Sequence, residues 1–144
     1  MKLVLQRVKK ASVSINNNIY SEIGKGILIL IGIEKGDTEQ DIEKYSQKVA
    51  KLRIFPDEND KMNRSIVDIA GEILVVSQFT LAGDCKKGTR PSFDNSAPPK
   101  EAEQLYELFV KNINKQNIPV KTGVFGAMMD VELINDGPVT FILG

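Results

Sequence analysis

The stretch Ile27–Ile33, with the sequence ILILIGI, is the longest apolar run in the chain and decides which fold it can adopt. An uninterrupted run of this length is typical of a strand that is buried on both faces of a sheet. It is far shorter than the about 20 residues that a helix needs to cross a bilayer. We therefore expect a central strand here, entered through the turn Gly24-Lys25-Gly26.

Three segments before this run alternate between polar and apolar residues, as half-buried strands do. They cover residues 3–8, 11–15 and 19–23, and Asn16-Asn17-Asn18 supplies turn chemistry because asparagine tolerates a left-handed backbone. These segments predict an antiparallel meander that ends in the apolar strand. Because the alternation starts at once, we expect no signal peptide.

Two amphipathic helices are expected after the meander. The first runs from Thr38 to Leu52, with Asp37 as its cap and Gln40 as the capping-box partner. The second begins near Pro99, a residue suited to a first helical turn. Their apolar stripes, which indicate core packing, are Ile42, Tyr45, Val49 and Leu52 in the first helix and Ala102, Leu105, Tyr106, Phe109, Val110 and Ile113 in the second.

The remaining elements complete a single predicted domain over residues 1–144. Segment 82–98 is a long irregular stretch rich in Gly, Pro, Ser, Asp and Lys, and such loops are often functional. No repeat or linker divides the chain, so we expect an α+β fold: a compact, mainly antiparallel sheet or barrel-like domain with two helices. Further strands are predicted at 72–81, 120–125, 128–134 and 140–143, the last two joined by a tight turn at 136–138.

Composition narrows the chemistry that the chain can perform. Its 19 basic and 19 acidic residues balance, which argues against broad electrostatic binding of nucleic acid but leaves room for a small basic patch. The single cysteine, Cys85, cannot form an internal disulfide, and we expect a cytoplasmic protein. The sequence contains no histidine, which excludes Ser-His-Asp and Cys-His catalysis and histidine-ligated metals. An enzyme of this composition would use hydroxyls, amides, carboxylates, lysine, backbone dipoles or its substrate, and we expect no metal and no cofactor.

Two motifs are candidates for a site. Ser77-Gln78-Phe79-Thr80 places hydroxyl and amide groups at the end of an apolar strand, either at a pocket rim or on a solvated edge. Thr80 lacks a neighbouring base, so donation of hydrogen bonds to an oxyanion suits this strand end better than nucleophilic attack. Asn135-Asp136-Gly137-Pro138 is either an ordinary turn or the site of a cis peptide bond, which proline adopts most readily. The basic loop Lys86-Lys87-Gly88-Thr89-Arg90 is either a phosphate contact or a solvated loop.

Taken together and in order, these motifs give the chain a specific resemblance to the D-aminoacyl-tRNA deacylases, essentially from end to end. The only departure is conservative variation around Gly126-Ala127-Met128. The segments that carry the resemblance are Gln6-Arg7-Val8, Ala11-Ser12-Val13, Ile23-Gly24-x-Gly26, Leu52-Arg53-Ile54-Phe55, Ser77-Gln78-Phe79-Thr80-Leu81, Arg90-Pro91-Ser92-Phe93, Thr122-Gly123-x-Phe125 and Asn135-Asp136-Gly137-Pro138-Val139-Thr140.

The resemblance implies a homodimer that hydrolyses the ester joining a D-amino acid, or misplaced glycine, to tRNA. It assigns the chemistry to Ser77-Gln78-Phe79-Thr80 and implies that Gly137 and Pro138 form a Gly-cisPro motif inserted into the partner's pocket. That motif would reject L-amino acids by exclusion, which is the physical route open when side chains are identical. Supporting residues are Arg7, which fixes the motif, with Phe125 and Met129; Lys86, Lys87 and Arg90 are candidate tRNA contacts.

The resemblance leaves two mechanisms open. Either Thr80 is the nucleophile, or the terminal adenosine's 2′-hydroxyl acts while the protein supplies position and backbone donors. The missing histidine favours the second. Two other functions also fit the residues: a non-catalytic dimeric module that binds RNA or a small metabolite, and a related deacylase with relaxed chirality.

Overall fold

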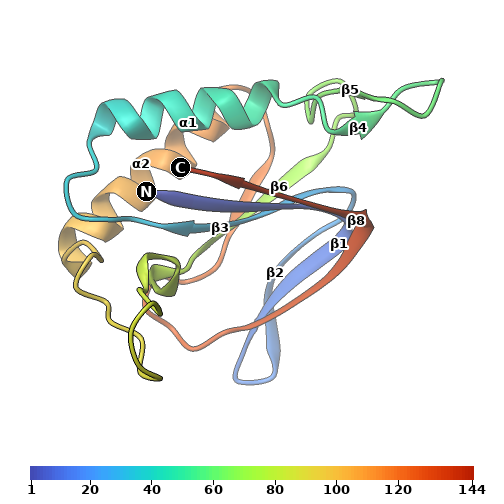
Figure 1. Ribbon diagram of the computed structural model, residues 1–144. Helices are drawn as coiled ribbons and strands as arrows, with labels where there is room; N and C mark the ends of the chain where they lie inside the picture. The colour runs from blue at the N-terminus through green and yellow to red at the C-terminus, as the bar shows by residue number, and fades with distance from the viewer.

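Two helices cover one face of a curved, six-stranded mixed sheet in the computed structural model of the chain, which describes residues 1–144 (Figure 1). The two termini lie side by side, since Leu3 pairs with Leu143. The strands of this sheet are β1 (Lys2–Ile15), β2 (Asn18–Ile23), β3 (Gly26–Gly32), β6 (Glu72–Ser77), β7 (Val120–Thr122) and β8 (Asp130–Leu143). The other elements are α1 (Glu39–Lys51), α2 (Pro99–Asn114), the 3₁₀ turn η1 (Phe79–Ala82) and a small hairpin of β4 (Phe55–Pro56) and β5 (Met62–Arg64).

The apolar run forms β3, and its burial on both faces is confirmed. Ile27, Leu28 and Ile29 are at most 1% exposed. Ile27 and Ile29 belong to the large core beneath the helices, whereas Leu28 belongs to a smaller core on the other face of the sheet. Alternate residues of one strand therefore hold two cores together, as the period of a strand requires.

The first three strands are antiparallel as predicted, but they do not form a simple meander. Segments 3–8 and 11–15, predicted as two strands, are one continuous strand, β1. Its first half pairs with β3 and its second half with β2, while β8 runs along its opposite edge. A long strand shared in this way lets the sheet curl, so β3 lies beside β1 and not beside β2.

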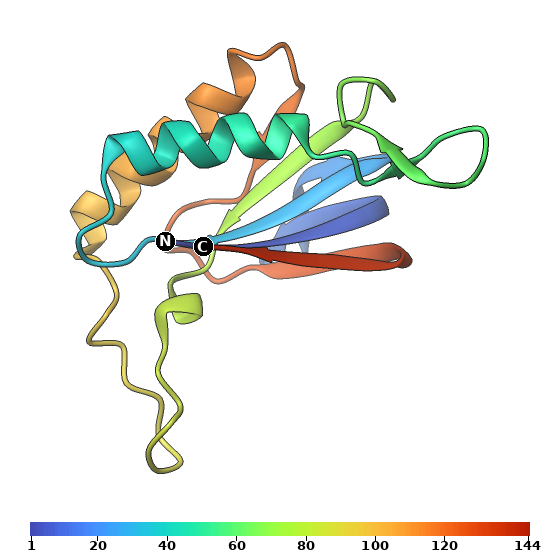
Figure 2. The same ribbon diagram turned by 45° about the horizontal axis from the view of Figure 1, so that its top comes forward.

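The prediction of a mainly antiparallel sheet missed two parallel pairings. β3 pairs with β6 and β6 pairs with β7, both in parallel. Parallel neighbours need a crossover connection, and α1 and α2 provide these two crossovers on the same side of the sheet (Figure 2). The α+β class is thus correct, with the antiparallel half built around β1 and the parallel half around β6.

The sheet approaches a barrel without closing through a ladder of backbone hydrogen bonds. The far strands β2 and β7 are joined by two side-chain contacts instead. Ser21 Oγ donates to the Thr122 carbonyl at 2.7 Å, and Lys121 Nζ donates to the Glu22 carbonyl at 2.8 Å. The small core lies inside this partial barrel.

Both helices lie close to their predicted residue ranges, but the residues that cap α1 differ from those predicted. Thr38 is the N-cap and Asp41 completes the capping box, so the predicted roles of Asp37 and Gln40 are wrong. The Asp37 carboxylate is occupied elsewhere, because it accepts from the backbone N–H of Glu34 at 2.7 Å. Pro99 begins α2 as expected. Neither helix has the length and apolar character needed to cross a membrane.

Several of the predicted strands need correction, and the strand expected over residues 120–125 ends at Thr122. The strand expected over residues 72–81 ends at Ser77, and the chain turns into η1. The hairpin of β4 and β5 was not predicted, although the charged turn between its strands is clear in the sequence. The strands 128–134 and 140–143 form one strand, β8, because residues 136–139 bulge out of the ladder with β1 rather than reverse the chain.

Candidate active site

A cleft of about 720 Å³ opens at the carboxyl end of β6. Ser77, Gln78 and Phe79 form one wall, and the irregular segment that contains Phe93 and Ala97 forms another. Most of the lining is apolar, with hydroxyl and amide groups at the strand end. Such a combination suits a small organic ligand that needs a few directed hydrogen bonds.

The strand end is positioned by a close approach of η1 to β3. The Gln78 N–H donates to the Ile31 carbonyl at 2.7 Å, and the Leu81 N–H donates to the Gln78 carbonyl at 3.1 Å. A Cβ at Gly32 would stand 2.9 Å from both the Gln78 carbonyl oxygen and the Leu81 Cβ. Only glycine therefore permits this turn to lie on β3, and the turn presents Ser77 and Gln78 to the cleft.

Thr80 lies in η1, next to the cleft but outside its lining. Its hydroxyl accepts a hydrogen bond of 2.5 Å from the Gln78 side-chain amide, its only side-chain partner. An amide is a very weak base, whichever of its two atoms faces the hydroxyl. Among its hydrogen-bond partners in this chain, the Thr80 hydroxyl therefore has no group that could take its proton.

The cleft lining also contains Phe125 and Met129. The Phe125 ring packs at 5.8 Å from the ring of Tyr106, whose hydroxyl donates to the Val75 carbonyl at 3.1 Å. Burial raises the pKa of Tyr106 to about 12, so this hydroxyl remains a donor at neutral pH. Met129 Sδ would stand only 2.6 Å from a Cβ at Gly123, so that glycine makes room for the thioether.

Gly137 and Pro138 are exposed in the bulge of β8 and do not line the cleft of their own chain. Their peptide bond is cis. Arg7 braces the bulge: its Nε donates to the Asp136 carbonyl at 2.9 Å, while one terminal nitrogen donates to the Ile54 carbonyl at 2.7 Å. The contact with the Asp136 carboxylate is longer, at 3.6 Å.

The basic residues Lys86, Lys87 and Arg90 are exposed and also lie outside the cleft. They occupy a loop that extends away from the sheet, closed at its base by an antiparallel bridge between Asp84 and Ser92 (Figure 2). The structure thus groups the predicted residues into three places: the cleft, the β8 bulge and this loop.

Among the residues of the cleft lining that sequence reasoning missed, two stand out, Phe93 and Lys35. Phe93 lies in the loop predicted to be functional, and its ring packs 5.2 Å from that of Phe79. Lys35 follows β3 and carries the only charge in the lining, but nothing in the local sequence distinguishes it from other surface lysines. No group of three or more His, Cys, Asp or Glu side chains is arranged to hold a metal ion.

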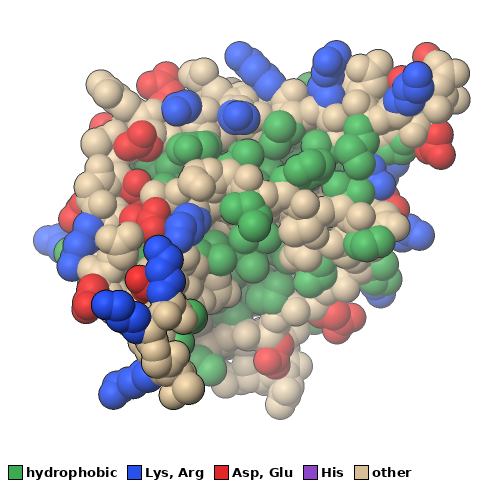
Figure 3. Space-filling view, in the orientation of Figure 1, with side chains coloured by type: hydrophobic (Ala, Val, Ile, Leu, Met, Phe, Trp, Pro, Cys, Tyr) green, Lys and Arg blue, Asp and Glu red, His purple; other side chains and the backbone are tan.

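Exposed apolar side chains follow β8, the strand that carries the bulge. Ile134 is 45% exposed and Ile142 is 72% exposed, with Phe141 beside it at 38%. Figure 3 shows hydrophobic side chains gathered across the middle of the face where β8 lies. The outer edge of β8 is also unpaired within the chain. We call Ile134, Phe141 and Ile142 together the β8 apolar patch; it spans both faces of this sheet edge, because the consecutive residues Phe141 and Ile142 point to opposite faces.

Known proteins share both the sequence and the fold. The sequence profile described as D-Tyr-tRNA(Tyr) deacylase matches residues 4–144. A D-aminoacyl-tRNA deacylase of Thermodesulfovibrio yellowstonii is 61% identical over 140 residues, covering 97% of this chain and 96% of that protein. One from Bacillus cytotoxicus is 55% identical over 143 residues, covering 99% and 98%.

Two solved structures have a fold similar to that of this chain. The c-Myc DNA Unwinding Element Binding Protein has a TM-score of 0.95 and 43% identity, covering 100% of this chain and 98% of that one. A probable eukaryotic D-amino acid tRNA deacylase has a TM-score of 0.81 over 99% of this chain and 97% of that one; at 18% identity it shows the fold alone. Because the profile spans almost the whole chain and relatives are more than half identical over nearly their full lengths, this chain belongs to the D-aminoacyl-tRNA deacylases, hydrolases that act on the ester bond of aminoacyl-tRNA.

Proposed function

We propose that the chain removes D-amino acids, and glycine attached to the wrong tRNA, and rejects L-aminoacyl-tRNA through Gly137 and Pro138. The observation that carries this proposal is the cleft at the end of β6, where Ser77 and Gln78 offer directed polar groups beside an apolar wall. An ester carbonyl fits such a place, because donors fixed before the reaction stabilise the oxyanion as it forms.

The site is completed by a second copy of the chain. Within one chain the Gly137–Pro138 bulge does not line the cleft, yet it projects from β8, whose apolar patch is exposed. Burial of that patch against a partner would bring the partner's bulge to the cleft. We propose that a homodimer has its active sites at this interface.

Selection against L-amino acids rests on rigid backbone. Gly137 has a φ of +141°, and the Arg7 guanidinium holds the preceding carbonyl of Asp136. The Asn135 side chain closes the bulge by accepting from the Val139 N–H at 2.7 Å. A backbone fixed at both ends has no freedom to move away from a misplaced side chain, so it excludes that side chain rather than adapting to it.

The reactive hydroxyl group in this proposal is supplied by the substrate and not by the protein. Thr80 accepts a hydrogen bond from Gln78 and has no base beside it, so its hydroxyl is a poor nucleophile. The terminal 2′-hydroxyl lies next to the scissile ester and is held by the same binding event. We propose that it takes part in the reaction while the protein positions the ester and the backbone donors.

Phosphates of the tRNA are proposed to contact Lys86, Lys87 and Arg90. These side chains are exposed on a projecting loop beside the cleft region, which suits contact with a large polyanion. Because tRNA charging takes place in the cytoplasm, we propose that the protein acts there.

One pair of substrates tests the proposal. Purified protein is incubated with D-Tyr-tRNA and with L-Tyr-tRNA, and the free amino acid is measured over time. We expect rapid release of D-tyrosine and stable L-Tyr-tRNA. Release from both substrates would indicate relaxed chirality, and release from neither would leave a binding module.

A nucleic-acid-binding module is the second candidate, because a solved structure of 43% identity is named as a DNA-unwinding-element-binding protein. The net charge of zero argues against it. A titration with single-stranded DNA decides between the two: binding as tight as that of D-aminoacyl-tRNA, without turnover of the ester, would favour this alternative.

A further inference from the structure

Lys35 is the one charged residue among the 17 that line the cleft. The other lining residues are apolar or carry only hydroxyl, amide or backbone groups. No carboxylate of the lining neutralises the Lys35 ammonium, and the side chain makes no ion pair elsewhere. The cleft therefore carries a single uncompensated positive charge at its rim, where Lys35 is exposed to solvent.

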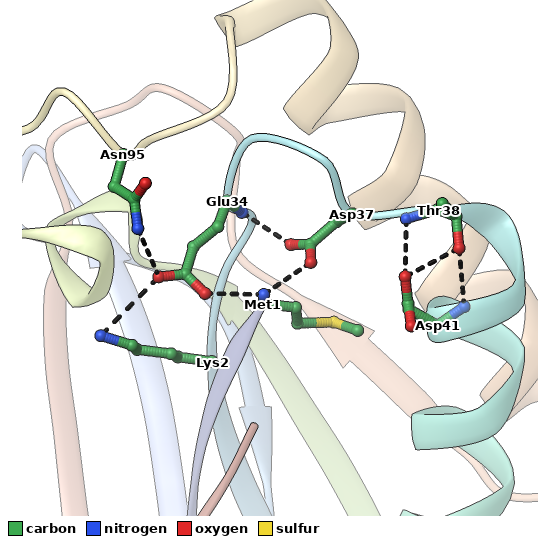
Figure 4. A network of polar contacts seen from close by, with 7 residues as sticks. All are labelled: Met1, Lys2, Glu34, Asp37, Thr38, Asp41 and Asn95. Atoms are coloured by element: carbon green, nitrogen blue, oxygen red, sulfur yellow. Dashed lines mark hydrogen bonds and ion pairs between the residues drawn. The ribbon is translucent and has the colours of Figure 1, made fainter.

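The backbone that carries Lys35 is held firmly. The Lys35 N–H donates to the Asn95 carbonyl at 3.0 Å, which ties it to the segment that forms the cleft wall. On either side of it, Glu34 and Asp37 bind the Met1 ammonium at 2.7 and 2.6 Å (Figure 4). Contacts on both sides of Lys35 therefore hold its backbone in place, as the backbone of a binding residue needs to be held.

The two neighbouring carboxylates are occupied, which leaves Lys35 free. Glu34 also lies 3.7 Å from Lys2 and accepts from the Asn95 side chain at 3.4 Å. Partial burial works to raise the pKa of Glu34, but the Met1 ammonium and Lys2 outweigh it and hold that pKa below its usual range. Glu34 is therefore charged at neutral pH and satisfied by other cations, so Lys35 is available to an external anion.

The substrate determines which anion this is, and the inference rests on the function proposed above. An aminoacyl-tRNA carries a positive α-ammonium on one side of the ester and the phosphodiester of its terminal nucleotide on the other. We propose that Lys35 binds the 5′-phosphate of the terminal nucleotide. The substrate then lies with its nucleotide end toward Lys35 and its amino acid in the part of the cleft away from Lys35.

The orientation of the substrate in the cleft follows from the charges on the substrate and on Lys35. Like charges repel, so an ammonium of the substrate placed beside Lys35 would be unfavourable, whereas a phosphate there gains a charge-assisted hydrogen bond. Because Lys35 is exposed, solvent and salt screen the pair, and we expect an effect on affinity of about 5-fold. This makes Lys35 a residue that binds and orients the substrate and not a catalytic residue.

A pair of stable analogues tests the inference without requiring turnover. The probes are 3′-deoxy-3′-(D-tyrosylamino)adenosine and the same compound with a 5′-phosphate, in which an amide replaces the ester. Their Kd values are measured by calorimetry for the unchanged protein, Lys35→Ala, Lys35→Arg and Lys44→Ala. Lys44 is a matched control, since it is an exposed lysine on α1 outside the cleft.

We expect the phosphate to improve Kd about 5-fold in the unchanged protein, in Lys35→Arg and in Lys44→Ala. In Lys35→Ala the two Kd values should become equal. A phosphate preference that persists in Lys35→Ala, or that is absent from the unchanged protein, would overturn the inference, as would failure of both probes to bind. Hydrolysis of D-Tyr-tRNA, measured separately, tests the proposed function, so the two can fail independently.

Discussion

Gly137 is the residue at which a single methyl group should do the most damage. Its φ of +141° disfavours any other residue, and an added Cβ would lie 2.7 Å from Val139 Cγ2 and 3.3 Å from a terminal nitrogen of Arg7. We expect Gly137→Ala to lower the rate of D-Tyr-tRNA hydrolysis by at least about 10-fold, because small displacements of a positioning group are costly.

Gly36 provides the matched control for this substitution. It also has a positive φ, +88°, but an added Cβ would meet nothing within 4 Å. Gly36→Ala should therefore retain most of the activity. Full turnover by Gly137→Ala, with its fold verified by circular dichroism, would contradict the assignment.

Thr80 tests the mechanism at the same scale. Since its oxygen accepts from Gln78 and no base adjoins it, Thr80→Val should slow hydrolysis only modestly, by about 2- to 5-fold, through a lost hydrogen bond. A substrate with hydrogen in place of the terminal 2′-hydroxyl, with the ester on the 3′-oxygen, should react about 100-fold more slowly. Rates are measured in single-turnover experiments.

The outcome can be separated from a general loss of binding, because each change removes one hydroxyl and leaves the other. An acyl adduct on Thr80 trapped by mass spectrometry would restore this residue as the nucleophile. Full activity toward the 2′-deoxy substrate would do the same.

At the scale of elements, the start of α1 depends on its capping box. The Thr38 hydroxyl and N–H both donate to the Asp41 carboxylate, at 2.7 and 2.9 Å, and the hydroxyl foremost holds the pKa of Asp41 below its usual range. We expect Thr38→Ala to lower Tm by about 3 °C at pH 7, measured by calorimetry. Thr38→Ser, which keeps the hydroxyl, should lose much less.

The pH dependence of this effect has a definite sign. A carboxyl group whose pKa is lowered on folding contributes stability above its ordinary value, 3.8 for Asp41, and loses it as the pH falls through the folded pKa. The Tm difference between the unchanged protein and Thr38→Ala should therefore shrink in acid. A difference that grows in acid would show that the cap acts by other means.

The basic loop Lys86–Arg90 is the second element with a measurable role. If its three basic side chains touch phosphates, replacing all three by alanine should raise KM for D-Tyr-tRNA and reduce the slope of log KM against log salt by about 2 to 3, with kcat unchanged. A triple variant of Lys44, Lys48 and Lys111, which changes the charge equally on the helices, should keep the original slope. Equal slopes in all three proteins would assign the loop to solvent.

At the scale of the whole molecule, activity should depend on assembly. A site completed by the partner's bulge cannot work in a monomer, so we expect a single dimeric species by light scattering and lower specific activity on dilution. Ile142→Asp, which places a charge in the β8 apolar patch, should give an inactive monomer. Ile19→Asp is the matched control, because Ile19 is 63% exposed on β2, outside the patch.

Mixing two damaged chains sharpens this test. Gly137→Ala alters the bulge, and Ala127→Trp fills the cleft, so neither should act alone. A mixed dimer has one site with an intact cleft and an intact bulge. Activity that recovers on mixing supports a shared site, whereas a fully active monomer would contradict it.

Part of this architecture follows from local sequence. The run Ile27–Ile33 can be buried only at the centre of a sheet, and the apolar stripes require two helices packed on it, because the spacing of apolar residues is a property of consecutive residues. Local sequence also shows that a strand ends near Ser77-Gln78-Phe79 and that Gly137-Pro138 lies in an irregular segment. The lack of histidine removes whole classes of catalysis without reference to any fold.

The tertiary structure determined the contacts between residues that are far apart in the sequence. Nothing near Asp37 in sequence reveals that its carboxylate binds the ammonium of Met1, 36 residues away, so the sequence alone did not exclude Asp37 as the cap. The parallel pairing of β3 with β6, across a helical crossover, brings Lys35 and Ser77 to one cleft from segments about forty residues apart. Periodicity fixes which face of an element is buried, whereas pairing between remote strands fixes which side chains meet. For that reason the sequence alone determined the helices, the central strand and several candidate site residues, and only the folded chain determined how the strands join and which of these residues share a cleft.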